Sequence, residues 1–143
     1  NGGHAMRINT STDYAVRMVL YLAKESKTMS SSRLAAAIGV SPRYLLQIGA
    51  KLRKAGLIVT VHGPTGGIHL SRSAKEISLY EVISVMEGSI GNKGLSKSQN
   101  APAEFEMLNI AYEYVNTVLV NILKSITIES LLIRSIETWH SDL

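Results

Sequence analysis

Cysteine is absent from this 143-residue sequence, and proline occurs only three times. The absence of cysteine excludes disulfides, thiol nucleophiles, thiolate zinc sites and cysteine-ligated iron–sulfur clusters. Charged residues are scarce at 18%, whereas hydrophobic residues make up 45% of the chain. This composition can build a buried core and excludes a disordered chain, and the length suits one compact domain with a short appended element.

Long hydrophobic runs are missing too. The longest apolar stretches, such as residues 18–23, fall far below the roughly 20 residues of a membrane span. No basic, apolar and small-residue leader opens the chain, and residues 1–5 (NGGHA) are typical of a cloning remnant ahead of Met6. From these absences we expect a cytoplasmic protein without membrane contact.

Signatures of catalysis and of metal binding are also absent. The sequence has no Gly-x-Ser-x-Gly and no His-Glu-x-x-His, and residues 63–67 (GPTGG) lack the Gly-Lys-Ser/Thr of a phosphate-binding loop. His62 and His69 are expected in opposing strands, but no carboxylate or third imidazole stands at ligand spacing. We therefore expect no enzyme, no metal site and no cofactor.

Positive charge is concentrated in the first half of the chain. Residues 1–75 hold 11 Lys or Arg and 2 acids, whereas residues 76–143 hold 4 Lys or Arg and 9 acids, within a net charge of +4. A basic segment is the electrostatic footprint of a phosphate-binding surface, because neutralising a polyanion releases its condensed counterions. The alternative is a solvated basic surface that only keeps the protein soluble.

Capping residues and helical spacing predict a helix-turn-helix in this basic half. A first core helix begins at a Ser11 or Thr12 cap, and a short helix ends at Gly39, where a left-handed cap suits glycine. Ser41 and Pro42 start the next helix as its cap and first residue. Its apolar residues Leu45, Ile48 and Leu52 face inward, and its outward face carries Arg43, Tyr44, Gln47, Lys51 and Lys54.

A β-hairpin and further helices follow. Residues 57–61 and 68–70 read as short strands around a turn, and Ser78 and Glu81 form a capping-box pattern before a helix that ends at Gly88. Residues 89–101 are typical of a flexible linker. From about residue 102 to 123, apolar residues form an a/d seam for packing along another helix: Phe105, Leu108, Tyr112, Val115, Leu119 and Ile122. A last helix is expected from a Thr127 cap through Trp139.

The sequence thus predicts a mainly α fold with a small β-hairpin. Residues 6–88 form a winged helix-turn-helix domain, residues 89–101 a linker and residues 102–143 dimerisation helices. The seam could also pack inside one chain. Dimerisation is favoured because the elements before Gly88 already close a small core.

Several linked motifs carry a family resemblance over residues 6–88. They are DYAVR at 13–17, SPRYL at 41–45, KLRKAGLI at 51–58, VHGPTGG at 61–67 and EISL at 76–79, followed by EG at 87–88. In this order and spacing they resemble the Rrf-type family of bacterial winged-helix transcription regulators.

The resemblance implies a homodimer that binds double-stranded DNA at a pseudo-palindromic operator and acts as a repressor. The helix over residues 41–55 would enter the major groove, and the hairpin over residues 57–70 would form a wing at the minor groove. Paired glycines would let the wing backbone approach DNA closely. The implied DNA-binding residues are Ser41, Pro42, Arg43, Tyr44, Gln47, Lys51, Lys54, His62, Thr65, Gly66 and Gly67.

The chain departs from the family pattern in four places. His62 stands where many members have arginine, Leu46 where an acidic residue is frequent, and Ile68 where an aromatic is usual. Cluster-binding members carry three cysteines in the stretch equivalent to residues 89–106, and this chain has none. The signal therefore stays open: a small molecule held between the linker and the long helix, a partner protein, or no effector at all.

A protein-interaction module is the alternative function. A winged helix that no longer binds DNA could dock a partner protein through Tyr44 and Leu46. Such a module would not need the basic side chains that gather around one hairpin. DNA binding is therefore favoured by Arg43, Lys51, Arg53, Lys54 and Arg72.

Overall fold

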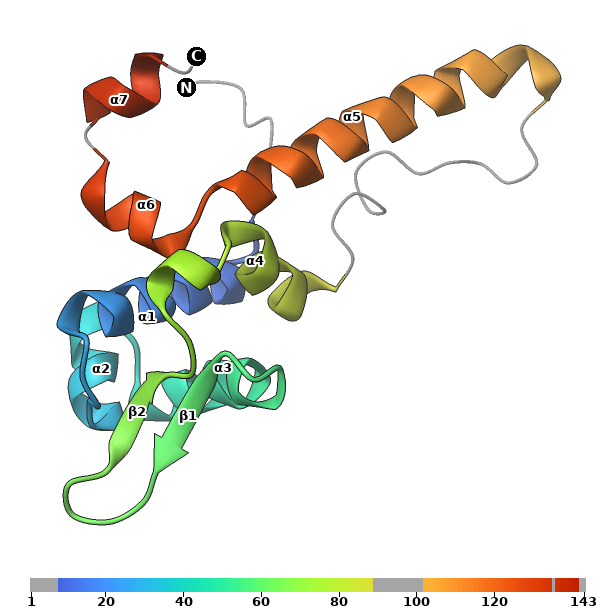
Figure 1. The fold of residues 1–143 in the computed structure, drawn as a ribbon. Coiled ribbons are helices and arrows are strands. Elements are labelled where there is room, and N and C mark those ends of the chain that lie inside the picture. The colour runs from blue at the N-terminus through green and yellow to red at the C-terminus, as the bar shows by residue number, and fades with distance from the viewer. Residues whose placement is uncertain (1–7, 89–101, 135, 142–143) are drawn as a thin grey trace.

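The computed structural model describes residues 8–88, 102–134 and 136–141. A bundle of short helices carries a two-stranded hairpin on one side, and one long helix extends away from the bundle (Figure 1). The elements are α1 (Thr10–Glu25), α2 (Ser31–Ile38), α3 (Pro42–Lys54), β1 (Ile58–Val61), β2 (Gly67–Leu70), η1 (Ala74–Glu76), α4 (Leu79–Glu87), η2 (Ala103–Phe105), α5 (Glu106–Ser125), α6 (Ile128–Ile133) and α7 (Ile136–Ser141).

Capping residues position the helix-turn-helix largely as the sequence predicts. The Tyr44 backbone N–H donates to Ser41 Oγ at 3.1 Å, and proline occupies the first turn of α3. Gly39 ends α2 with φ of +81°. The expected cap of α1 is wrong, because the helix begins after Asn9 and Thr12 is fully buried within it.

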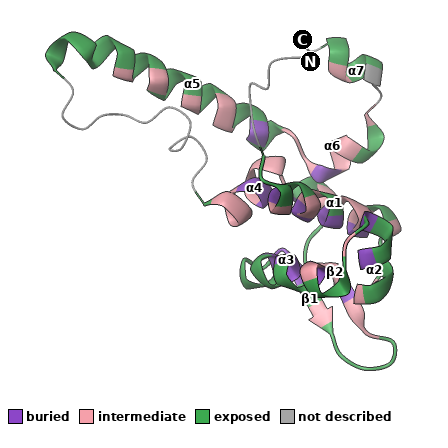
Figure 2. Ribbon diagram, turned by 180° about the vertical axis from the view of Figure 1, so that it is seen from behind, coloured by how far each residue is buried: buried purple, intermediate pink, exposed green. Residues whose placement is uncertain are grey.

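Helix α1 lies at the centre of the core. Its Met18 and Leu22 pack into the same buried cluster as Leu34 of α2, Leu52 of α3 and residues of α4 (Figure 2). This cluster also takes Ile128, whose side chain has no exposed surface. Residues beyond 101 therefore help to close the core, and the expectation that the elements before Gly88 close it by themselves is wrong.

Two backbone hydrogen bonds fasten α6 to the start of α4. The Leu79 N–H donates to the Ile126 carbonyl at 2.7 Å, and the Ile128 N–H donates to the Ile77 carbonyl at 2.9 Å. The Ser78 hydroxyl caps α4 as predicted. The Glu81 carboxylate of the capping-box pattern instead pairs with Arg72, which leads from the hairpin into η1.

The hairpin is antiparallel, with Ile58 opposite Leu70 and Val61 opposite Gly67. Met29, from the segment between α1 and α2, adds a bridge on the far side of β2. The Met29 N–H donates to the Ile68 carbonyl at 2.9 Å, and the Ile68 N–H donates back at 2.7 Å. Ile68 is buried, so it packs the hairpin onto the helices without an aromatic ring. The arrangement is a winged helix-turn-helix.

The C-terminal helices differ from the prediction at their end. Thr127 caps α6 as expected, but α6 ends at Ile133 and α7 is a separate helix, so the expectation of one helix through Trp139 is wrong. Arg134, in extended conformation after α6, stacks its guanidinium 3.7 Å from the Trp139 ring centroid. Among the described residues, no helix is long and apolar enough to cross a membrane.

Candidate nucleic-acid interface

The outward face of α3 is a stripe of exposed residues at spacings of four, three and four. Arg43, Gln47, Ala50 and Lys54 lie on this stripe, opposite the buried face of the helix. Arginine and glutamine here can offer hydrogen bonds to base edges, and lysine can contact phosphate. All of them except Ala50 are among the DNA-binding residues that the family resemblance implies.

Tyr44 and Lys51 lie to one side of this stripe, on the flank of α3 toward α1. Tyr44 is half-buried rather than left to solvent, because its ring packs edge-on against Tyr14 with 5.9 Å between ring centroids. Lys51 is exposed. Tyr44 therefore helps to hold the start of α3 against α1.

The other flank of α3 faces the wing across a hollow of about 330 Å³. Leu46 and Arg53 of α3 line it, together with Val61 and His62 of the hairpin and the serines that open α2. Leu46 is 58% exposed and Val61 is 43% exposed. The DNA-binding residues implied by the resemblance do not include Leu46 or the α2 serines, and Arg53 was counted only among the basic side chains near the hairpin. The seven-residue spacing of Leu46 and Arg53, which places both on one side of a helix, was the available signal.

The wing tip presents His62 and Thr65 to solvent. His62 lies one residue beyond β1, and His69 in β2 is opposite Val59, so the expectation of the two histidines in opposing strands is wrong. The His69 ring nitrogen Nδ1 is hydrogen-bonded to the Leu70 carbonyl at 2.8 Å. The two imidazoles therefore belong to different parts of the wing.

Both wing glycines are required by contacts within the chain. A Cβ on Gly66 would lie 2.1 Å from the Val61 carbonyl oxygen. A Cβ on Gly67, which has φ of +152°, would lie 2.1 Å from the Met29 carbonyl oxygen. The hairpin closes only because side chains are missing at these two positions.

Within the part of the chain that the structure describes, no carboxylate pairs with the cations of α3. The structure contains two ion pairs within its described ranges, Arg17 with Asp13 and Arg72 with Glu81. Neither involves α3, whose last turn carries Lys51, Arg53 and Lys54. Uncompensated positive charge therefore covers the exposed side of α3, beside the wing.

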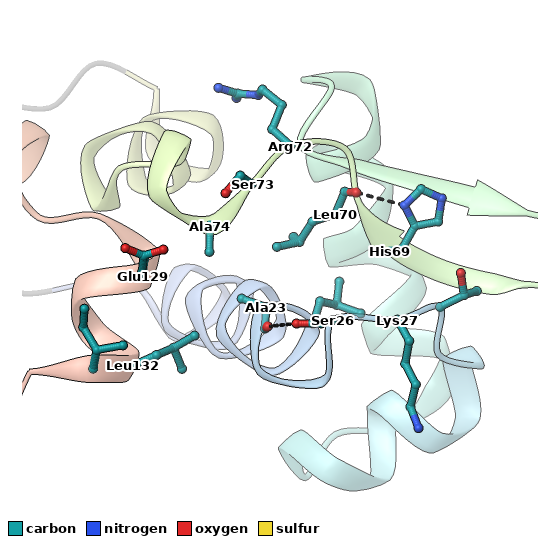
Figure 3. A pocket seen from close by; sticks show the side chains of 13 residues that line it. Ala23, Ser26, Lys27, His69, Leu70, Arg72, Ser73, Ala74, Glu129 and Leu132 are labelled. Carbon is teal, nitrogen blue, oxygen red and sulfur yellow. Dashed lines mark hydrogen bonds between the residues drawn. The ribbon is translucent and has the colours of Figure 1, made fainter.

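A larger hollow of about 600 Å³ lies between the end of α1, the exit of β2 and α6 (Figure 3). Leu22, Leu70 and Leu132 form its apolar lining, and the side chains of Lys27 and Arg72 point away from each other at its rim (Figure 3). This hollow is not the space between the linker and the long helix, which was one of the open alternatives for an effector. Residues 89–101 lie outside the described part of the chain.

Helix α5 leaves most of its apolar surface uncovered, and Leu123 is the one buried residue among its 20. Of the predicted seam, Phe105, Leu108, Val115 and Ile122 are exposed, and Tyr112 and Leu119 are half-buried. The sequence missed a second apolar stripe. It runs beside the seam and consists of Met107, Ile110, Tyr114 and Val118, all exposed.

Comparison with known proteins identifies the family of this fold. A family model described as Rrf2, iron-dependent transcriptional regulator, matches residues 8–134. The chain belongs to the Rrf2 family. A curated relative in Rhizobium meliloti, the protein aau3, is 44% identical over 85 residues, which cover 59% of this chain and 55% of the relative.

Two further Rrf2-type proteins extend this comparison. The HTH-type transcriptional regulator NsrR of Halalkalibacterium halodurans is 34% identical over 87 residues, 59% of this chain and 60% of the relative. The match thus spans little more than half the length of these curated relatives. The solved structure of T. potens IscR is 30% identical, with a TM-score of 0.72, over 92% of this chain and 89% of that chain.

The residues present do not fit the iron that the Rrf2 description names, if that iron is held by cysteines. The sequence contains no cysteine. Among the described residues, no three His, Asp or Glu side chains gather into a group that could hold a metal ion. This Rrf2 chain therefore has no thiolate ligand for iron.

Proposed function

We propose that this Rrf2-family chain is a sequence-specific DNA-binding transcription regulator that acts as a homodimer on a pseudo-palindromic operator. The observation that carries the proposal is the row of unpaired cations on α3 beside a protruding wing. Such a surface attracts phosphate without any carboxylate to compete for its charge.

In the proposed complex, α3 lies in the major groove and the wing approaches the minor groove. Arg43 and Gln47 face base edges, while Lys51 and Lys54 contact the DNA backbone. Ser41 and Pro42 bring the N-terminus of α3 toward phosphate, with Tyr44 behind them. The wing contributes His62, Thr65, Gly66 and Gly67.

The homodimer is proposed to form through α5. Its two exposed apolar stripes would be covered by the same helix of a second copy, since an apolar helix face in water is unfavourable. A twofold dimer presents two α3 helices, which suits half-sites about one DNA turn apart or a multiple of it.

Binding-site selection from a random duplex library, followed by titration at several salt concentrations, tests this function. We expect one enriched pseudo-palindrome and an affinity that falls steeply as salt rises. Equal affinity for all duplexes would contradict sequence-specific binding. Repression is tested separately, because an operator placed over a reporter promoter should lower expression when the protein is present.

In the alternative function, the domain would dock a partner protein through Tyr44 and Leu46. Tyr44 is half-buried against Tyr14, so only Leu46 of the two is exposed on the domain surface. An enzyme is not proposed, since the polar residues around α3 suit contacts with a polyanion rather than a reaction. Absence of any selected sequence in the library experiment would favour the alternative.

A further inference from the structure

The N-terminal half of α3 carries Arg43 and Gln47, the polar residues of this helix that are best suited to contact bases. Leu46 is an apolar side chain between them. It follows Arg43 by one helical turn and precedes Gln47 directly, and 58% of it is exposed. The C-terminal half of the helix carries Lys51, Arg53 and Lys54. Base contacts are thus expected in the first half and backbone contacts in the second.

Leu46 is not an isolated apolar residue on the surface, because a second exposed apolar side chain lies near it. Val61 of the wing, 43% exposed, lies across the same hollow of about 330 Å³. Arg53 and Ser30 line that hollow as well and can hold phosphate oxygens near it. The hollow therefore combines an apolar wall with polar groups that suit a DNA strand.

Leucine can donate and accept no hydrogen bond, so its partner at a base edge must be apolar. In the major groove the one apolar group among the four base pairs is the 5-methyl group of thymine. Contact with that methyl group would cover Leu46 without leaving a base donor or acceptor unsatisfied. A cytosine at the same place would present only a hydrogen at its C5 position, so Leu46 would lose the methyl contact.

We propose that Leu46, with Val61 beside it, forms an apolar subsite for a thymine methyl group in each operator half-site. The subsite makes Leu46 a specificity-determining residue of this chain, and it rests on the DNA-binding function proposed above. Arg43 and Gln47 would read neighbouring base pairs by hydrogen bonds, and Leu46 would select thymine by its shape and lack of polarity.

The test replaces thymine with deoxyuridine at each enriched position of the selected operator. This change removes one methyl group and leaves every hydrogen-bonding group in place. We expect one sensitive position in each half-site. Replacing the thymine at that position should lower the affinity of the wild-type protein by about fourfold, the effect of losing the burial of one apolar carbon. The Leu46→Ala variant should bind the thymine and deoxyuridine duplexes equally.

Gln47→Ala is the matched control on the same helix. It should bind the thymine and the deoxyuridine operator more weakly than the wild type does, but keep the wild-type ratio between these two duplexes. Leu46→Gln provides a second variant whose polar side chain should also lose that ratio. Leu46 is a surface residue, and circular dichroism of both Leu46 variants should match the wild type.

The possible outcomes separate the two proposals. A library that yields no enriched sequence overturns the proposed function and the subsite with it. An enriched operator whose thymine methyl groups make no difference to the wild type overturns the subsite alone. The subsite is also overturned if the Leu46→Ala variant still binds the deoxyuridine duplex more weakly than the thymine duplex.

Discussion

At the scale of single residues, the wing depends on the absence of a side chain at two glycines. Gly66 and Gly67 stand where the hairpin turns back against its own first strand and against the segment at Met29. The sequence suggested that paired glycines let DNA approach the wing. The structure adds that any β-carbon at either position would collide with a backbone carbonyl.

Gly67→Ala should therefore lower the free energy of unfolding by at least about 2 kcal/mol, because the new Cβ would overlap the Met29 carbonyl in a backbone conformation that alanine disfavours. Urea denaturation of the purified variant measures this loss. Gly49→Ala is the control. Its Cβ would meet the flexible Met18 Cε at 3.4 Å and Ile58 Cδ1 at 3.7 Å, and better helix propensity should stabilise α3 by up to about 1 kcal/mol. An unchanged midpoint for Gly67→Ala would contradict the close contact.

A second prediction at this scale separates base contacts from phosphate contacts. Arg43→Ala and Gln47→Ala should each relax base preference by about 1 to 3 kcal/mol, the value of one bidentate contact. Lys54→Ala should weaken binding to all sequences alike and reduce the salt dependence by about one released ion. Titrations of operator and unrelated duplex at three salt concentrations measure both effects. Identical, salt-insensitive behaviour of the three variants would rule out the assignment of α3 to the groove.

At the scale of elements, the hydroxyl groups of three serines and one threonine cap the start of four helices. Ser30, Ser41, Ser78 and Thr127 each accept a hydrogen bond from a backbone N–H in the first turn of the following helix. Each cap satisfies a donor that the helix leaves unpaired.

Ser41→Ala should cost about 1 kcal/mol of stability, because the Tyr44 N–H loses its partner in the protein. Thermal unfolding measures the loss, and operator affinity should fall with it as the first turn of α3 frays. Ser32→Ala, on the exposed side of α2, is the control and should change neither quantity. A Ser41→Ala variant as stable as that control would mean that α3 does not need its cap.

At the scale of the whole molecule, α5 is a long helix whose own chain leaves most of its apolar surface exposed. It extends from the bundle with two apolar stripes exposed, and only its last turn reaches the core through Leu123 (Figure 1). In contrast, α6 returns to α1 and buries Ile128. The described residues thus form a closed bundle with one long helix whose apolar stripes stay exposed.

Val115→Asp combined with Leu119→Asp should convert the proposed dimer into a folded or partly folded monomer. Charge on this face would remain unpaired in an apolar interface, so the two helices separate. Operator affinity should fall by orders of magnitude, because the second half-site contact is no longer intramolecular. Sedimentation and DNA titration check this. A stable double-mutant dimer, or a monomer with wild-type affinity, would remove α5 from the interface.

Iron should not change the colour or the DNA binding of this protein. With no cysteine in its 143 residues, the purified protein should be colourless and should bind DNA identically with and without oxygen, iron or nitric oxide. Absorption spectra after anaerobic reconstitution with iron and sulfide measure this. A visible charge-transfer band with matching iron and sulfide content would contradict it.

Local patterns in the sequence were enough to predict most helix boundaries, the hairpin and the polar stripe of α3. Caps, left-handed glycines and apolar spacing act over a few residues, so their physical cause lies within the stretch that is read. For that reason Ser41, Pro42 and Gly39 were placed correctly. The cap of α1 was misplaced because Thr12 is drawn into the core, which no local pattern records.

Tertiary structure alone decided the features that depend on distant segments. Met29 became the third partner of the hairpin, Ile128 completed the core of the first 88 residues, and Tyr44 turned toward Tyr14. Leu46 became part of a hollow only because the wing stands beside α3. The sequence by itself determined which side chains and which short elements exist. Packing determined which of them meet, because burial and backbone pairing join residues that lie far apart along the chain.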